Sequence, residues 1–169
     1  MPFVRPAAAA AALALLAAGC GGACTTSSTA TTTSTAAAKG HTVALHVVHQ
    51  GEATIALVQV TIGGKGPYAF ALDTGAAHSA IDVELAKKLG LERVGQTKVS
   101  GVVKTDTVPQ FRIGSWKVDG LKLKENTVSG TDLQRGDGPG LAGLLGSDVL
   151  SRFQRVTIDY DAQTLLLVD

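Results

Sequence analysis

Short apolar runs, each closed by glycine or polar residues, dominate the chain after residue 40. Two such runs, Val43–Val48 and Ile55–Ile62, flank the polar Gln50–Glu52, and the second run ends at Gly63–Pro67. Apolar runs that are rich in β-branched residues and bounded by turn residues are typical of strands in hairpins. The pattern therefore predicts a hairpin here, followed by a strand over Tyr68–Leu72.

One segment has helical character. It begins with Asp82 and Glu84, ends with Lys87 and Lys88, and is followed by Gly90. An acidic start, a basic end and a glycine stop are the usual signals of a helix. We expect a short helix between Asp82 and Gly90.

The second half of the chain returns to extended patterns. The apolar positions of residues 97–113 surround Ser100 and Gly101 and predict another hairpin. The pattern then predicts, in order, strands over Trp116–Asp119 and Leu121–Val128, a loop over Ser129–Gly140, a strand that turns into a short helix over Leu141–Leu150, and a closing hairpin across Asp161–Gln163.

Composition agrees with a mainly β fold. The chain is 45% hydrophobic but only 4% aromatic, and it contains 20 glycines. Its core must therefore consist of valine, leucine, isoleucine and alanine between tight turns. Residues 41–169 match the usual size of one domain, which buries one core. A site that needs two lobes would have to take the second from another chain.

Charge and histidine spacing exclude some classes of function. The chain is 17% charged with a formal net charge of +1, so it lacks the basic surface that binds phosphate backbones, and we expect no nucleic-acid partner. His41, His46 and His49 have neither the alternating spacing of a strand face nor the spacing of a helical i, i+4 pair, and no cysteine or carboxylate cluster accompanies them. We therefore expect no metal and no cofactor.

The first 20 residues have the pattern of an export signal. Arg5 precedes an apolar run over residues 7–18, which is too short for the roughly 20 residues of a membrane-spanning helix. Leu16–Cys20 resembles a bacterial lipobox, although its leucine lies one residue further from the cysteine than usual. The resemblance implies acylation of Cys20 and a lipid-anchored protein of the bacterial cell envelope, facing the periplasm or the exterior. Ordinary cleavage after a small residue is the alternative and would give a secreted protein.

A linker follows the signal. Residues 25–38 are all threonine, serine or alanine, which predicts a flexible tether over residues 21–40. The two cysteines, Cys20 and Cys24, precede the predicted domain, so no disulfide is expected within it. Contact with the membrane is expected through the lipid anchor only.

One tripeptide is chemically unusual. Asp73–Gly75, which reads Asp-Thr-Gly, directly follows the apolar Phe70–Leu72. A carboxylate beside a buried strand costs stability unless it is hydrogen-bonded, which favours a functional role, but Asp-Thr-Gly is also good turn chemistry. The residues alone leave both interpretations open. His78 and Ser79 do not complete a triad with the aspartate, because so short a loop cannot place a base between nucleophile and orienter.

Two motifs together resemble the retropepsin-like aspartic proteases, the single-domain relatives of pepsin. Phe70–Ile81 looks like the catalytic loop of that family, and Gly143–Phe153 looks like its apolar-apolar-glycine strand and following helix. The resemblance covers Ala53–Asp169 and implies a mainly β fold, a closed β-barrel or acid-protease half-lobe with one or two short helices. It assigns four residues to the catalytic loop: Asp73 as the catalytic residue, with Thr74, Gly75 and Ala76 as its support.

The chemistry of that family uses two aspartates that share one proton and activate a water. The chain has no second Asp-Thr-Gly or Asp-Ser-Gly, so the resemblance implies a homodimer with one Asp73 from each copy. It further implies that Thr74 hydrogen-bonds to the partner chain and that Gly75 allows close approach of the backbone.

The resemblance also implies roles for two other segments. The hairpin around Ser100 and Gly101 lies where the family has its flap over the substrate. Asp148 lies at the start of the second helix, where we interpret it as structural and not as a second catalytic acid.

The leading hypothesis is an aspartic endopeptidase that hydrolyses extended peptide or protein substrates as a homodimer, with the substrate bound by strand addition. A non-catalytic envelope module, which uses the same fold for peptide binding or dimerisation, is the alternative. A third hypothesis is an enzyme that processes only itself or one partner.

Overall fold

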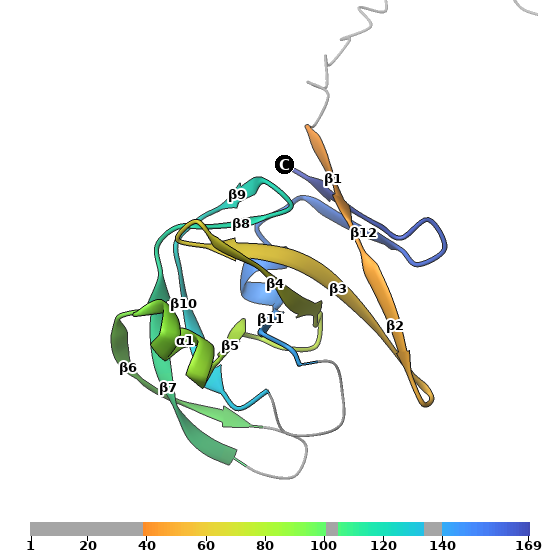
Figure 1. The fold of residues 1–169 in the computed structure, drawn as a ribbon. Coiled ribbons are helices and arrows are strands. Elements are labelled where there is room, and N and C mark those ends of the chain that lie inside the picture. The colour runs from red at the N-terminus through yellow and green to blue at the C-terminus, as the bar shows by residue number, and fades with distance from the viewer. Residues whose placement is uncertain (1–38, 101–104, 134–139) are drawn as a thin grey trace, which may run out of the picture. The chain divides into compact units, whose positions relative to one another are not determined.

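Strands make up most of the chain that the structure describes. The computed structural model describes residues 39–100, 105–133 and 140–169, and Figure 1 shows its ribbon. The elements in chain order are β1 (Gly40–Ala44), β2 (His46–Gln50), β3 (Ala53–Ile62), β4 (Lys65–Leu72), β5 (Ala80–Asp82), α1 (Val83–Leu89), β6 (Arg93–Ser100), β7 (Thr105–Ile113), β8 (Trp116–Val118), β9 (Leu121–Leu123), β10 (Asn126–Thr131), β11 (Gly143–Leu145), α2 (Ser147–Leu150), β12 (Arg155–Asp159) and β13 (Thr164–Val168).

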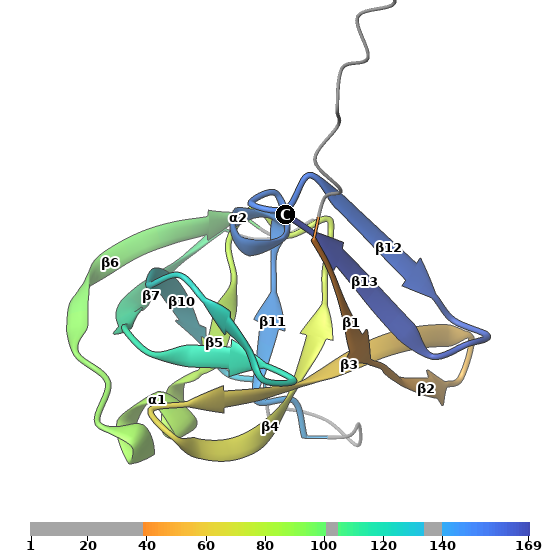
Figure 2. The same cartoon turned by 90° about the horizontal axis from the view of Figure 1, so that it is seen from above.

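The described strands form two sheets, which confirms the mainly β fold with two short helices. The larger, ten-stranded sheet has the order β6-β7-β10-β5-β11-β4-β3-β8-β9, with β2 paired to β3. The smaller has the order β1-β13-β12, and Figure 2 shows β13 between the other two strands. Two pairs in the larger sheet, β4 with β11 and β5 with β10, are parallel and join segments far apart in sequence.

The larger sheet is open, which corrects the expected closed barrel. Its terminal strands, β6 and β9, each pair with one neighbour among the described residues. The backbone leaves the ladder directly after β9, because the carbonyl of Lys124 accepts a hydrogen bond from the indole N–H of Trp116 at 2.8 Å. This also explains why the strand predicted over Leu121–Val128 is divided into β9 and β10.

Local sequence signals predicted α1 and the tight hairpins correctly. The side chain of Asp82 accepts a hydrogen bond from the backbone N–H of Leu85 and caps the start of α1, and Gly90 ends the helix at φ 69°. Gly63 and Gly64, at φ 56° and 78°, make the turn between β3 and β4. The hairpins β2–β3, β6–β7 and β12–β13 are also confirmed.

The strand predicted over Val43–Val48 is two strands in different sheets. Strand β1 pairs with β13, whereas β2 pairs with β3. Leu45 lies between them, is buried, and donates its backbone N–H to the carbonyl of Gln163 at 2.9 Å. This contact with the β12–β13 turn interrupts the strand where the chain passes from one sheet to the other.

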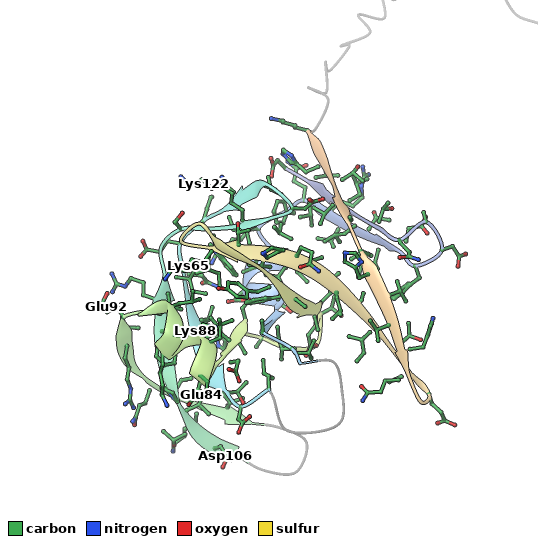
Figure 3. All side chains as sticks on the ribbon, in the orientation of Figure 1. Lys65, Glu84, Lys88, Glu92, Asp106 and Lys122 are labelled. Atoms are coloured by element: carbon green, nitrogen blue, oxygen red, sulfur yellow. The ribbon has the colours of Figure 1, made fainter. Side chains whose placement is uncertain are left out.

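Aliphatic side chains from both sheets form one core, as the composition predicts. Its fully buried members include one phenylalanine and one tryptophan beside aliphatic residues, among them Val58, Val60, Phe70, Ile81, Ile113, Trp116, Val128, Leu165 and Leu167. Charged side chains of both signs lie at the periphery, as the six labelled ones in Figure 3 illustrate.

Residues 1–38 lie outside the described residues, so the export signal, the anchor at Cys20 and the tether remain predictions. Within the described part of the chain, no helix has the length and apolar character needed to cross a membrane.

Candidate active site

Asp73 lies where two parallel strands end together. Strand β4 ends at Leu72, which is paired in register with Leu145, the last residue of β11. The backbone N–H of Asp73 donates to the carbonyl of Leu145 at 3.1 Å. The parallel pairing therefore fixes the backbone of Asp73 at the rim of the sheet, with its side chain half-buried.

The turn that follows orients one oxygen of the Asp73 carboxylate. Oδ1 accepts hydrogen bonds from the backbone N–H groups of Gly75 and Ala76, each at 3.0 Å. No residue that the structure describes donates to Oδ2. One oxygen is thus held by the loop, and the other can meet a water, a substrate or a second carboxyl group.

Thr74 and Gly75 are exposed at the tip of this loop. The Thr74 carbonyl accepts from the hydroxyl of Ser147 at 3.0 Å, while its own side chain makes no hydrogen bond within the described chain. A Cβ on Gly75 would lie 3.4 Å from Oδ1 of Asp73, an ordinary contact. The single chain therefore gives no steric reason for glycine at position 75.

The loop rests on Gly146 and the start of α2. The backbone N–H of Ser147 donates to the carbonyl of Ala76 at 2.9 Å. A Cβ on Gly146 would lie 2.8 Å from the carbonyl carbon of His78 and 2.9 Å from the nitrogen of Ser79, closer than side chains tolerate. The glycine of the second motif is thus required because the loop backbone packs directly on it.

The side chain of Asp148 holds the Asp73 loop through hydrogen bonds to Ser79. Its Oδ1 accepts from both the backbone N–H of Ser79, at 2.9 Å, and the Ser79 hydroxyl, at 2.7 Å, and its Oδ2 accepts from the side-chain amide of Asn126 at 2.6 Å. The Ser79 hydroxyl in turn accepts from the backbone N–H of Gly146 at 3.0 Å. These bonds support a structural role for Asp148, because its carboxylate is occupied by the fold.

Two members of this network, Arg152 and Asn126, were not predicted from the sequence. Arg152 donates to the Asp148 carbonyl at 2.8 Å and to the Asn126 side chain at 2.9 Å. No local signal marks Asn126, which is 22 residues from Asp148. Ser79 is fully buried beside the apolar β5, and this position is the one clue that its hydroxyl has a structural partner. Its burial also removes it as a nucleophile, which agrees with the rejection of a triad.

The predicted flap is described only in its stem. Strands β6 and β7 are paired as far as Ser100 with Thr105, and Gly101 lies outside the described residues. That this hairpin covers the site stays a prediction.

The three histidines of the first strands do not come together as a metal site. His41 contacts Asp169 at 3.3 Å, and His49 contacts Thr54 at 3.1 Å. Among the described residues, no group of three or more histidine, cysteine, aspartate or glutamate side chains is placed to hold a metal ion.

Two cavities, of about 500 and 440 Å³, lie away from the Asp73 loop. The first is lined mainly by residues of β9, α2 and the segment after α2, and the second by β1, β9 and the turn before β9. Neither contains a residue of the Asp73–Ala76 loop.

Comparison with known proteins decides the family. A family model described as aspartyl protease matches residues 58–149, which include the whole first motif, the second motif as far as Val149 and all the strands between them. The chain belongs to the aspartyl protease family. No curated protein sequence matches it.

Comparison with solved structures bears on the fold. The chain is similar to a retropepsin-like aspartic protease from Rickettsia conorii, with a TM-score of 0.52 and 20% identity over 78% of this chain and 93% of that one. It is also similar, at a TM-score of 0.45 and 15% identity, to a foamy viral protease-reverse transcriptase solved with an RNA/DNA hybrid, covering 63% of this chain and 13% of that one. The first likeness confirms the retropepsin-like fold.

Proposed function

We propose that this aspartyl protease is an endopeptidase that works as a homodimer, with Asp73 of each copy forming one catalytic dyad. The observation that carries the proposal is the Asp73 carboxylate itself, with Oδ1 held by two backbone N–H groups and Oδ2 left open. One such carboxylate cannot act as base and acid at once, and the sequence supplies one Asp-Thr-Gly per chain.

The dyad would divide the work between its two members. Two carboxyl groups held close together retain one proton between them, because like charges that near cannot both ionise cheaply. The ionised group takes a proton from a water as the water oxygen bonds to the scissile carbonyl carbon, and the protonated group donates to the carbonyl oxygen. The C–N bond then breaks as the nitrogen takes the proton that the first carboxyl group received from the water, and the second carboxyl group regains a proton from a hydroxyl of the intermediate.

The exposed tip of the loop suits a meeting of two copies. The Thr74 side chain is free to hydrogen-bond to a second chain, and Gly75 presents no side chain there, although its own chain would accommodate one. The anchoring to Gly146, Ser147 and Asp148 supports a preorganised loop, which catalysis by a fixed dyad requires.

The proposed substrate is an extended peptide or protein segment. Peptides in extended conformation bind to strand edges through backbone hydrogen bonds. We also propose that the protein acts in the bacterial cell envelope, held by acylated Cys20 and the tether, on the grounds of the lipobox-like sequence.

A comparison of cleavage tests this function. The full chain and its Asp73→Asn and Asp73→Ala variants are incubated with a diverse peptide pool, and new termini are identified by mass spectrometry. We expect both variants to lose at least about 1,000-fold in rate, since general acid and base action together are removed. Glu52→Gln, which neutralises an exposed carboxylate in the β2–β3 turn, serves as the control and should cleave like the wild type. Equal cleavage by Asp73→Asn and the wild type would contradict the proposal.

A further inference from the structure

The cavity of about 500 Å³ borders β9, the strand at one open edge of the larger sheet. Strand β9 pairs only with β8 among the described strands, and Figure 1 shows it outside β8. The four consecutive residues Leu121–Lys124 all line the cavity. Successive side chains of a strand point to opposite faces, so a continuous lining of this kind indicates that the backbone edge itself borders the cavity.

The backbone of Lys122 is available at this edge. Strands β8 and β9 are joined by a two-residue turn, Asp119 and Gly120, at φ 43° and 85°. In such a hairpin the residues that flank the turn bond to each other, and bonded positions alternate along both strands. The N–H of Asp119 donates to the carbonyl of Gln59 in β3 at 3.0 Å, in agreement with this alternation. Lys122, one position further from the turn, therefore directs its N–H and C=O groups away from β8.

A fixed positive charge lies at the same cavity. The Arg152 guanidinium donates to the Asp148 carbonyl at 2.8 Å and to the Asn126 side chain at 2.9 Å, with longer bonds of 3.4 Å to the carbonyls of Lys124 and Glu125. All four acceptors are neutral, so they hold the guanidinium in place without cancelling its charge. No described carboxylate forms an ion pair with it. A guanidinium held in this way favours a carboxylate ligand.

The other charges around the cavity leave this positive charge uncompensated. Lys122 and Lys124 are exposed and form no ion pair with the described residues. Asp169 is the one acidic side chain among the described lining residues, and its Oδ2 contacts His41 at 3.3 Å. The lining therefore carries an excess of positive charge.

Four of the lining residues are apolar. Leu123 and Val149 are buried, while Leu121 and Phe153 are half-buried and pack against the core. An apolar side chain that entered the cavity would contact these groups and lose its contact with water. The cavity thus combines an apolar lining, a positive charge and an open strand edge.

We propose that this cavity binds the C-terminal end of a peptide or protein chain whose last residue is apolar. The bound chain lies along β9 and bonds to the backbone of Lys122, while its carboxylate meets Arg152 and Lys124. Since Arg152 bonds to the carbonyl of Lys124, just past the end of β9, the bound chain runs parallel to β9. A peptide is the occupant because a strand edge and a carboxylate site are both means of peptide recognition. The proposal goes beyond the protease function and does not require the Asp73 dyad.

Titration with a short peptide tests the site. The full chain carrying Asp73→Asn, so that the proposed dyad does not consume the probe, is held in a mild non-ionic detergent and titrated with acetyl-Ala-Ala-Leu-Leu that has a free carboxylate. The readout is the NMR signal of the indole N–H of Trp116, the single tryptophan of the chain, which donates to the Lys124 carbonyl at 2.8 Å. We expect a saturable shift with a dissociation constant below about 1 mM.

Changes to the probe separate the parts of the recognition. The C-terminal amide of the same peptide lacks the negative charge and should bind at least about 10-fold more weakly. Methylation of the last two amide nitrogens removes donors for strand pairing and should weaken binding at least about 5-fold. Octanoate keeps a carboxylate and an apolar chain but has no amide groups, so it should bind at least about 10-fold more weakly than the peptide.

Charge reversal tests the protein side. In the Asp73→Asn background, Lys124→Glu should raise the dissociation constant of the peptide at least about 10-fold. Lys88→Glu reverses an exposed charge on α1, which does not line the cavity, and should leave binding unchanged. Arg152 is not substituted, because its bonds to Asp148 and Asn126 belong to the network that holds the Asp73 loop.

The outcomes distinguish this site from the protease function. An indole signal that does not move up to about 5 mM peptide, equal binding of acid and amide, or a Lys124→Glu variant that binds like its parent would each overturn the site. Equal binding of the methylated peptide or of octanoate would overturn a peptide paired to β9. Cleavage of peptides by the wild-type chain tests the function separately. A chain that cleaves but fails these binding tests keeps the function and loses the site, and one that binds as expected but does not cleave keeps the site and loses the function.

Discussion

The anchoring of the Asp73 loop can be tested by removing the carboxylate of Asp148. Asp148→Ala deletes the acceptor of three hydrogen bonds, two from Ser79 and one from Asn126. Bonds to a charged acceptor contribute about 1.5–3 kcal/mol each, and a buried donor left without a partner costs about 1–3 kcal/mol. Because the Ser79 backbone N–H has no water to replace the lost oxygen at 0% exposure, we expect Asp148→Ala to lower the free energy of unfolding by about 3–5 kcal/mol.

Urea unfolding measures this loss. Trp116 is the single tryptophan of the chain and is 0% exposed, so its fluorescence reports the opening of the core. The midpoint should fall while the slope of the free energy against urea stays constant, since the surface exposed on unfolding is unchanged. A domain of this size is stable by about 5–15 kcal/mol, so the loss is a large part of the total.

Asparagine at the same position is the matched control. Asp148→Asn keeps an oxygen that can accept from Ser79, but its new NH₂ group faces the NH₂ group of Asn126. If the Asn126 side chain rotated to offer its oxygen instead, its NH₂ group would face the guanidinium of Arg152. We expect a smaller loss of about 1–2 kcal/mol. A double-mutant cycle with Ser79→Ala should give a coupling energy of about 1–3 kcal/mol. An Asp148→Ala variant within about 1 kcal/mol of the wild type would refute the reasoning.

Two further predictions concern the second motif and the N-terminal signal. Gly146→Ala places a Cβ 2.8 Å from the backbone of His78, so urea unfolding should show a loss of about 1–3 kcal/mol, and under the proposed function peptide cleavage should fall as well. Gly95→Ala is the control, because its Cβ would meet only the Gln110 side chain at 3.5 Å; it should change neither the free energy of unfolding nor peptide cleavage. Cys20→Ser should abolish incorporation of labelled palmitate in a bacterial host, whereas Cys24→Ser should retain it, and label on Cys20→Ser would exclude acylation at that residue.

Local signals in the sequence predicted the elements that local chemistry determines. Asp82 and Gly90 mark α1 because a cap and a left-handed stop act within a few residues. The Asp73 loop was likewise predictable, because its tripeptide forms its own hydrogen bonds over two and three residues. The aspartyl protease assignment needed the second motif as well.

Features that depend on distant contacts could not be predicted in this way. Strand β1 is separated from β2 at Leu45 by a bond to Gln163, and β9 ends where Trp116 binds the carbonyl of Lys124. Nor does any periodicity reveal that Asn126 meets Asp148. These contacts join segments brought together only by the parallel pairs and the core, and the open sheet order follows from them.

The pairing of β1 with β13 has a consequence for timing during synthesis. Gly40 pairs with Val168 and Ala44 with Thr164. The smaller sheet therefore cannot form around β1 until residues 164–168 have been synthesised. Contacts of such long sequence separation form late, because loop closure precedes any gain from them. A nascent chain that has not yet reached residue 164 has neither β13 nor a β12 held beside it. The smaller sheet of a growing chain therefore stays incomplete until residues 164–168 have been synthesised, and until then β1 and β12 lack the strand that lies between them.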